Sequence, residues 1–260
     1  GAVSYGIQIY CDFNSYSLIA LGAAKTLGFD LINNFETPYF AQSVTEFWHR
    51  WHISLSTWLR DYVYISMGGN RCSKWHQYWN ILVTFMVSGL WHGANWTFLV
   101  WGALHGFYQI LEKEFRPVIR KINGYCHTKT ASFGYRFAKA AATFVLVDFA
   151  WIFFRADSVR QALYYIKRMF GYVDGWSLFD GSLYTLGLDV QEIHILLIGL
   201  AGLLIVDLVQ YFKRKKIAEA LQEQWIVFRW CVLICLVIGC IVFGYYGQGF
   251  ESAQFIYLQF

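Results

Sequence analysis

Long apolar segments with few charges recur along this chain and predict helices that cross or enter a membrane. A membrane-spanning helix needs about 20 mostly apolar residues, and its backbone polar groups must bond within the helix. Six segments approach this pattern: Val3–Leu27, Tyr78–Leu90, Trp96–Leu111, Phe137–Phe154, Ile193–Phe212 and Ile226–Tyr246. The shortest, Tyr78–Leu90, is expected to be tilted, extended or re-entrant. Because no internal repeat or linker divides the chain, we expect one all-α, multi-pass membrane domain over residues 1–260.

The composition supports a lipid environment and excludes nucleic acid as a partner. Hydrophobic residues make up 57% of the chain and charged residues only 15%, whereas about a quarter of the residues in soluble domains are charged. The net charge is +4. A stripe of basic residues with interleaved aromatics is typical of nucleic-acid binding, and the basic residues here form no such stripe. The 6 cysteines include no CxxC pair, so we expect neither a disulfide framework nor a metal site.

The segment Glu46–Val63 predicts one continuous amphipathic helix near the membrane surface. At about 100° per residue, its apolar side chains fall within an arc of roughly 160°. These residues are Phe47, Trp48, Trp51, Leu55, Trp58, Leu59, Tyr62 and Val63. Arg50 and Arg60 are expected on the opposite, wet side. His52 falls on the apolar side and needs a partner there, whereas His49 falls on the polar side, so the two histidines do not share a metal.

Basic residues predict which parts of the chain face the cytoplasm. The loop Lys113–Lys139 and the cluster Lys213–Lys216 are both rich in lysine and arginine, and such segments stay on the cytoplasmic side. Two predicted spans separate them, the even number that a shared side requires. The amphipathic segment Ser158–Phe170 is then expected at the opposite, outer interface.

One histidine, His92, stands at the end of the uncharged run Tyr78–Leu90, inside the sequence Gly89–Asn95. An ionisable side chain at membrane depth is costly and marks a candidate functional site. A histidine can accept and return a proton near neutral pH. A lone histidine on an apolar helix is more often a hydrogen-bonded packing residue, so spacing alone leaves both interpretations open.

Two blocks, Glu46–Arg71 and Gly89–Gly106, resemble the signature blocks of the membrane-bound O-acyltransferase (MBOAT) family. The resemblance is strongest to the bacterial branch that includes the alginate O-acetylation membrane protein. Further blocks resemble the same branch and follow in the same order: Gln8–Phe29, Asn33–Phe40, Trp151–Ser158 and Phe255–Phe260. Asn14-Ser15 and Ser66-Met67 depart from the usual residues, and neither departure touches the histidines. Members of this branch are nearly twice as long, so we expect this chain to lack an amino-terminal set of membrane helices.

The resemblance implies a reaction and assigns roles to residues. It implies that His92 is the catalytic histidine and that His52 is a second active-site residue. The reaction is transfer of an acyl group, usually acetyl, from a thioester to a hydroxyl, with His92 as the general base. His52, Trp91 or Asn95 would then stabilise the oxyanion. We expect both histidines to converge on one water-accessible tunnel, because each needs a polar cavity or a partner to offset its desolvation.

Further expectations concern substrates and partners. Asp12 and Asn14 either line the substrate site or form helix-to-helix hydrogen bonds. The donor is acetyl-coenzyme A or an acylated carrier, used as a co-substrate without a bound cofactor or metal, and the acceptor is an exported or cell-surface polysaccharide. The resemblance also implies membrane lipid and an extracytoplasmic acetylation protein as partners at the cell membrane. Three alternatives stay open: D-alanyl transfer to teichoic acid, a non-enzymatic transporter, and an inert fragment.

Overall fold

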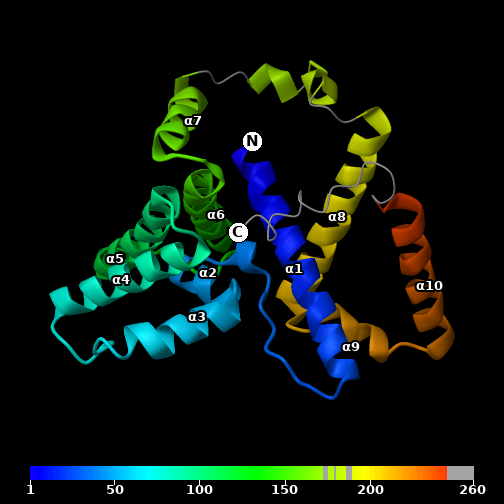
Figure 1. Cartoon of the computed structure of the whole chain (residues 1–260), viewed down its shortest axis with the longest axis horizontal. Helices are drawn as coiled ribbons and strands as arrows, with labels where there is room; N and C mark the ends of the chain where they lie inside the picture. The colour runs from blue at the N-terminus through cyan, green and yellow to red at the C-terminus, as the bar shows by residue number, and fades with distance from the viewer. Residues whose placement is uncertain (172–174, 179, 186–188, 245–260) are drawn as a thin grey trace. The chain divides into compact units, whose positions relative to one another are not determined.

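Helices form the regular structure in the residues that the computed structural model describes, which are 1–171, 175–178, 180–185 and 189–244 (Figure 1). In chain order they are α1 (Ala2–Thr26), η1 (Pro38–Phe40), α2 (Val44–Arg50), α3 (Ile53–Leu59), the π-helical turn η2 (Arg60–Tyr64), α4 (Lys74–His92), α5 (Trp96–Tyr125), α6 (Phe133–Arg155), α7 (Val159–Gly171), η3 (Gly175–Leu178), η4 (Ser182–Thr185), α8 (Val190–Lys213), α9 (Ile217–Gln222) and α10 (Ile226–Phe243). Within those residues the only β pairing is an isolated antiparallel bridge between Phe35 and Trp51. The predicted all-α class is confirmed.

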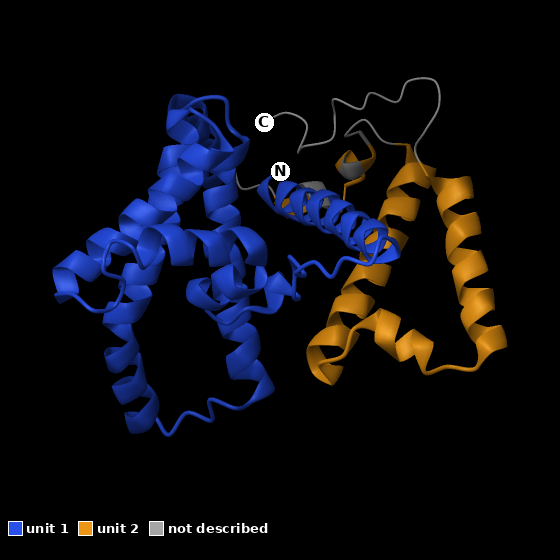
Figure 2. Ribbon diagram, turned by 60° about the horizontal axis from the view of Figure 1, so that its bottom comes forward, with its two compact units in different colours: residues 1–171, 253–260 blue, residues 172–252 orange. Residues whose placement is uncertain are grey.

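The helices fall into two compact units (Figure 2). The first contains α1 to α7, and the second contains η3 to α10. The block Phe255–Phe260 lies outside the described residues, and the single domain expected over residues 1–260 stays a prediction.

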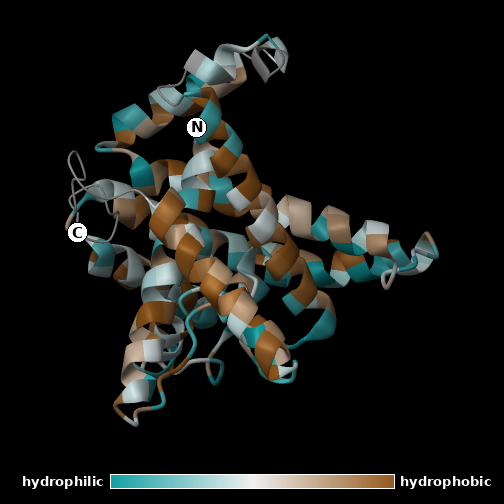
Figure 3. Ribbon diagram, turned by 90° about the vertical axis from the view of Figure 1, so that its right-hand side faces the viewer, coloured by the Kyte–Doolittle hydropathy of each residue, from teal (hydrophilic) through white to brown (hydrophobic). Residues whose placement is uncertain are grey.

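Three helices are long and apolar enough to cross a membrane, namely α6, α8 and α10. Each of them coincides with a segment predicted from the sequence. The ribbon in Figure 3 is coloured as hydrophobic along much of the helices. The other predicted apolar segments form α1, α4 and α5, and the amphipathic segment Ser158–Phe170 forms α7. Hydropathy therefore located every long helix of the described chain.

The segment Glu46–Val63 is not one helix, so the prediction of a continuous helix is wrong. α2 ends at Arg50, Trp51 is extended, and His52 has a left-handed backbone before α3 begins at Ile53. The periodic spacing of apolar residues continues through this break in the sequence because both short helices bury their apolar sides. Periodicity alone therefore could not reveal it.

Burial follows the predicted apolar side over most of this segment. The residues expected in the core are buried: Trp48, Trp51, Leu55 and Leu59. Arg60 is exposed as predicted, whereas Arg50 is half-buried because it pairs with Glu46 at 2.6 Å. Trp58 and Tyr62 were expected on the buried side and are 50% and 68% exposed. The break and the π-helical turn that follows α3 change the direction of the helical face, so the apolar arc does not extend that far.

The stretch Lys113–Lys139 was expected to be a loop, and this expectation is also wrong. Helix α5 continues to Tyr125 and α6 begins at Phe133, so only residues 126–132 lie between them. Hydropathy falls after Leu111 because charged side chains cover the exposed surface of the helix. This fall in hydropathy does not distinguish a solvent-exposed helix from a loop.

Polar caps set the start of four helices of the first unit. Helices α2, α4, α5 and α6 begin after Ser43, Ser73, Asn95 and Ser132, whose side chains each accept a backbone N–H of the first turn. Such a cap satisfies an N–H group that has no partner within the helix and contributes about 1 kcal/mol.

Helices α4 and α5 approach each other closely because glycines lie where they cross. A Cβ added at Gly102 would lie 2.1 Å from the carbonyl oxygen of Phe85. One added at Gly89 would lie 2.2 Å from the carbonyl oxygen of Phe98. Any side chain at either position would force the backbones apart. This contact fixes the end of α4, where His92 lies, against α5.

Candidate active site

His52 lies at the break between α2 and α3 in a backbone conformation that few residues adopt. Its φ of 45° and ψ of 53° are left-handed, which costs an L residue roughly 1–2 kcal/mol. Such conformations persist where the surrounding structure imposes them, and they cluster at functional sites. The residue is only 8% exposed, so the break directs the side chain into the first unit.

The loop Asn33–Phe40 holds this break in place through hydrogen bonds that the backbone and the side chain of Asn34 accept. The Ile53 amide donates to the Asn34 backbone carbonyl at 3.1 Å. The side-chain oxygen of Asn34 accepts from the amide of Ser54 at 3.2 Å and from its hydroxyl at 2.7 Å. These bonds begin α3 directly after His52 and therefore set the position of the histidine.

The His52 ring lies among aromatic side chains from two other helices. Its centroid is 4.6 Å from that of Phe13 on α1 and 5.9 Å from that of Trp91 on α4. Neither ring nitrogen has a hydrogen-bond partner within the described part of the chain. Burial, and then the nearby His92, lower the pKa of His52 to about 3, so the ring is neutral at pH 7. A buried imidazole of this kind calls for a ligand or a water as its partner.

His92 is the last residue of α4, and aromatic rings surround it. The ring centroids of Trp91, Trp101 on α5 and Phe154 on α6 lie 4.9, 5.3 and 5.2 Å from its own. His92 lies outside the three helices that are apolar enough to span a membrane. Burial lowers its pKa to about 4, so the ring is neutral at pH 7 and able to accept a proton.

The Trp91 ring contacts both histidine rings, with its centroid 5.9 Å from that of His52 and 4.9 Å from that of His92. The structure thus brings His52, at the break between α2 and α3, to Trp91 and His92 at the end of α4. The water-accessible tunnel expected to join them stays a prediction. In the described ranges, no three histidine, cysteine, aspartate or glutamate residues gather as metal ligands.

Asn95 and the two polar residues of α1 take other positions. Asn95 caps α5 through its side-chain oxygen, and its side-chain amide donates to the Asp157 carbonyl at 3.2 Å. Asp12 and Asn14 are half-buried and flank Phe13 on α1. Since successive helical residues are about 100° apart, they point to opposite sides of Phe13. Substrate contacts by Asp12, Asn14 and Asn95 stay predictions.

The aromatic wall of this site was not predicted from the sequence. Phe13, Trp101 and Phe154 contact the two histidines, and Trp151 stacks on Trp101 at 5.6 Å. Trp151 and Phe154 are three residues apart and therefore share one face of α6. That spacing was the available signal for two of the four residues.

A third histidine, His105, packs against Trp101 of this aromatic wall. It is fully buried, and its Nδ1 accepts a hydrogen bond from the Trp48 indole N–H at 3.1 Å. Its ring lies 5.1 Å from that of Trp101. The bond joins α2 to α5 and places both helices against the ring that contacts His92.

Comparison with known families defines the class of protein. Residues 2–154 match the family described as MBOAT, membrane-bound O-acyltransferase family. The chain belongs to this family and, with its three apolar helices, is a membrane protein. The resemblance found in the sequence blocks is confirmed.

The curated proteins similar to this chain are transferases named for different acceptors. The chain is 44% identical to "Probable alginate O-acetylase AlgI" of Azotobacter vinelandii over 180 residues, which are 69% of this chain and 34% of that protein. It is 38% identical to the peptidoglycan O-acetyltransferase of Helicobacter pylori over 180 residues, 68% of this chain and 32% of that protein. It is 32% identical to the teichoic acid D-alanyltransferase of Streptococcus thermophilus over 126 residues, 46% of this chain and 30% of that protein. The chain thus spans about a third of the length of the curated relatives it matches.

Proposed function

We propose that this protein transfers an acetyl group from a thioester to hydroxyls of an exported or cell-surface polysaccharide. The observation that carries the proposal is the meeting of two neutral histidines, His52 and His92, at Trp91 in a chain of the MBOAT family. Similarity to proteins named for O-acetylation of alginate and of peptidoglycan supports acetyl as the group and a polysaccharide as the acceptor.

His92 is proposed as the general base. A sugar hydroxyl is a weak nucleophile, and a neutral imidazole can take its proton while its oxygen attacks the thioester carbonyl carbon. The tetrahedral intermediate then collapses and the carbon–sulfur bond breaks. The thiolate takes the proton from the imidazolium, so the products are an ester and a free thiol. The aromatic wall around His92 limits water, which would compete for the acyl group.

His52 and Trp91 are proposed to stabilise the negative charge that develops on the carbonyl oxygen. A neutral imidazole carries one N–H donor, and both ring nitrogens of His52 are buried without a protein partner among the described residues. A donor that is positioned before the reaction costs no reorganisation when the charge develops. Asn95 is less suited because its amide already donates to Asp157.

The donor and the partners follow from the same chemistry. Acetyl-coenzyme A and an acylated carrier present the same thioester, and acyl transfer by this route needs no bound cofactor. We propose that the protein works in the cell membrane together with an extracytoplasmic protein that completes acetylation of the polysaccharide. D-alanyl transfer to teichoic acid is the second candidate, favoured only by the similarity over 46% of the chain to a D-alanyltransferase.

The proposal is tested by measuring thiol release from acetyl-coenzyme A or an acetylated carrier in the presence of polysaccharide. His92→Ala is expected to lower the rate by roughly 10²- to 10⁴-fold, the range for a positioned acid–base group, with unchanged protein yield. His49→Ala is the matched control, since His49 is exposed on α2, and it should keep the wild-type rate. Full activity of a well-folded His92→Ala protein would remove the general base. Failure of the wild-type protein to consume either thioester would remove the proposed function.

A further inference from the structure

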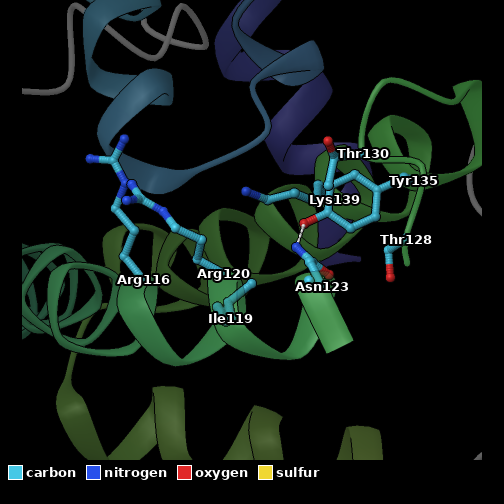
Figure 4. Close-up of a pocket in the computed structure, with 9 residues that line it drawn as sticks. Arg116, Ile119, Arg120, Asn123, Thr128, Thr130, Tyr135 and Lys139 are labelled. Carbon is cyan, nitrogen blue, oxygen red and sulfur yellow. Dashed lines mark hydrogen bonds between the residues drawn. The ribbon is translucent and has the colours of Figure 1, made fainter. Parts of the chain in front are cut away.

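A basic hollow lies between the carboxyl-terminal part of α5 and the start of α6 (Figure 4). Its volume is about 450 Å³. Arg116 and Arg120 line it from α5 and Lys139 lines it from α6. Figure 4 shows the two arginine side chains extending to the same side of α5. Three cationic groups therefore face one space.

The nearest carboxylates on α5 are occupied elsewhere. Glu112 accepts hydrogen bonds from the amide and the hydroxyl of Thr45 on α2, both at 3.1 Å. Glu114 pairs with Lys74 on α4 at 2.6 Å. No ion pair joins the three cations of the hollow to an acidic residue in the described part of the chain. The positive charge of the hollow is therefore left for an external anion.

Neutral donors complete the lining. The Asn123 side-chain amide donates to the Tyr135 hydroxyl at 2.7 Å, as the dashed line in Figure 4 marks. Because that hydroxyl accepts from Asn123, its own proton is free to be donated. Thr128 and Thr130 add hydroxyl groups. Guanidinium groups and hydroxyl donors together match the several oxygens of a phosphate group.

The position of the hollow separates it from the histidine site. Arg116 is fifteen residues beyond Trp101 on α5, or about 22 Å along the helix axis at 1.5 Å per residue. Lys139 and Phe154 are separated by the same length on α6, which is a candidate membrane span. The hollow therefore lies at one end of the span and the aromatic wall of the histidine site at the other.

Exposed apolar side chains adjoin the hollow at this end of the span. Phe133 and Phe137, on the first turns of α6, are 72% and 64% exposed. On α5, Ile119 and Ile122 are 44% and 54% exposed. A charged hollow beside apolar surface suits a molecule with an anionic head and hydrocarbon tails, whereas a free anion needs only the charge.

We propose that this hollow binds the phosphate headgroup of an anionic phospholipid, of which phosphatidylglycerol is the simplest probe. Basic pockets between membrane helices bind anionic headgroups in this way. The acyl chains lie along the exposed aromatic and aliphatic side chains at the start of α6 and the end of α5. The bound lipid ties the ends of the two helices together at the membrane interface.

Retention of phosphatidylglycerol by the purified protein tests this proposal. The protein is placed in nanodiscs of phosphatidylcholine with a small fraction of phosphatidylglycerol, and the retained lipid is measured by native mass spectrometry. Removing one cation near the membrane surface weakens binding by about 5-fold. Arg116→Gln, Arg120→Gln and Lys139→Gln are therefore each expected to lower retention about 5-fold, and the triple variant by up to about 100-fold. The single variants keep the test decisive if the triple variant does not fold.

A control with the same loss of charge distinguishes a site from general attraction. Lys25→Gln/Arg160→Gln/Lys167→Gln removes three exposed cations of the first unit that do not line the hollow. It should change retention less than 2-fold, so an equal loss would overturn the proposal. Inorganic phosphate, added to nanodiscs of pure phosphatidylcholine, forms the second arm. If millimolar phosphate raises the melting temperature of the wild-type protein but not of the triple variant, the site takes soluble phosphate and the lipid assignment is wrong.

Discussion

Replacing Gly102 by alanine tests whether the close contact of α4 and α5 positions His92. The added Cβ would lie 2.1 Å from the Phe85 carbonyl oxygen, whereas Cβ contacts under 3.0 Å essentially do not occur. The two backbones must therefore separate by about 1 Å. Overpacking of this kind costs about 1–3 kcal/mol, and the better helix propensity of alanine returns about 0.5–1 kcal/mol. A net loss of stability of about 0.5–2 kcal/mol is expected.

The effect on activity should exceed the effect on stability. His92 ends the helix that has to move, and a misplacement of 1 Å at a catalytic group can lower the rate by about 10²-fold. The assay measures thiol release from acetyl-coenzyme A. In the same preparation, thermal unfolding in detergent is monitored by size-exclusion chromatography after heating.

Gly124→Ala is the matched control because it lies on the same helix and has no neighbouring atom within 4 Å. It should leave the rate unchanged and the stability equal or slightly higher. If Gly102→Ala retains both the wild-type rate and the wild-type melting temperature, the helices do not cross as closely as described. In that case this contact does not position His92.

Four further predictions follow from the site and the topology. Because burial lowers the pKa of His92 from 6.5 to about 4, the neutral base persists as the pH falls, and the rate should stay level down to about pH 5 and halve near pH 4; a midpoint near 6.5 would contradict this. The unfolded chain binds more protons than the folded chain below about pH 6.5, so acid also lowers stability, and unfolding must be followed in the same samples. Asn34→Ala removes two bonds to Ser54 and should lower the free energy of unfolding by about 1–3 kcal/mol, measured by thermal unfolding, and reduce acyl transfer; unchanged values would show that Asn34 does not hold the break. Asn95→Ala removes the cap of α5 and should cost about 1 kcal/mol of stability without shifting the pH midpoint of the rate; a shifted midpoint would place Asn95 at the reacting groups. Cys126, which is exposed, and a cysteine introduced into Lys213–Lys216 should resist an impermeant maleimide in intact cells and react after permeabilisation; labelling of either from outside would overturn the shared cytoplasmic side.

The helices could be predicted because their signal is local. Each long apolar run in the described chain became a helix, since apolar side chains and helical hydrogen bonding within one segment decide that outcome. The break at His52 could not be predicted in the same way. It depends on Asn34, a residue from another segment, whose backbone and side chain bond to the start of α3. No window that contains only residues 46–63 holds that information.

The two histidines could be proposed from the sequence blocks, but their surroundings could not. His92 owes its aromatic wall to the way α4 and α6 each pack against α5, which brings Phe154 against a residue far from it in the sequence. The position of Asn95 also differs from the expected contact with the substrate or the oxyanion. A polar residue before an apolar run indicates a helix cap as readily as a ligand contact, and the structure shows the cap.

The left-handed backbone at position 52 also limits which substitutions can be tolerated there. Under the proposed function the residue provides an imidazole, and it also adopts a conformation that glycine and asparagine adopt more readily than most other residues. Asparagine is one nucleotide change away from histidine in the genetic code. His52→Asn would keep the break and the fold but lose the imidazole. A folded membrane protein without the second histidine is thus a single mutational step from this chain, which offers a route by which a transferase of this kind could lose its chemistry and retain its place in the membrane.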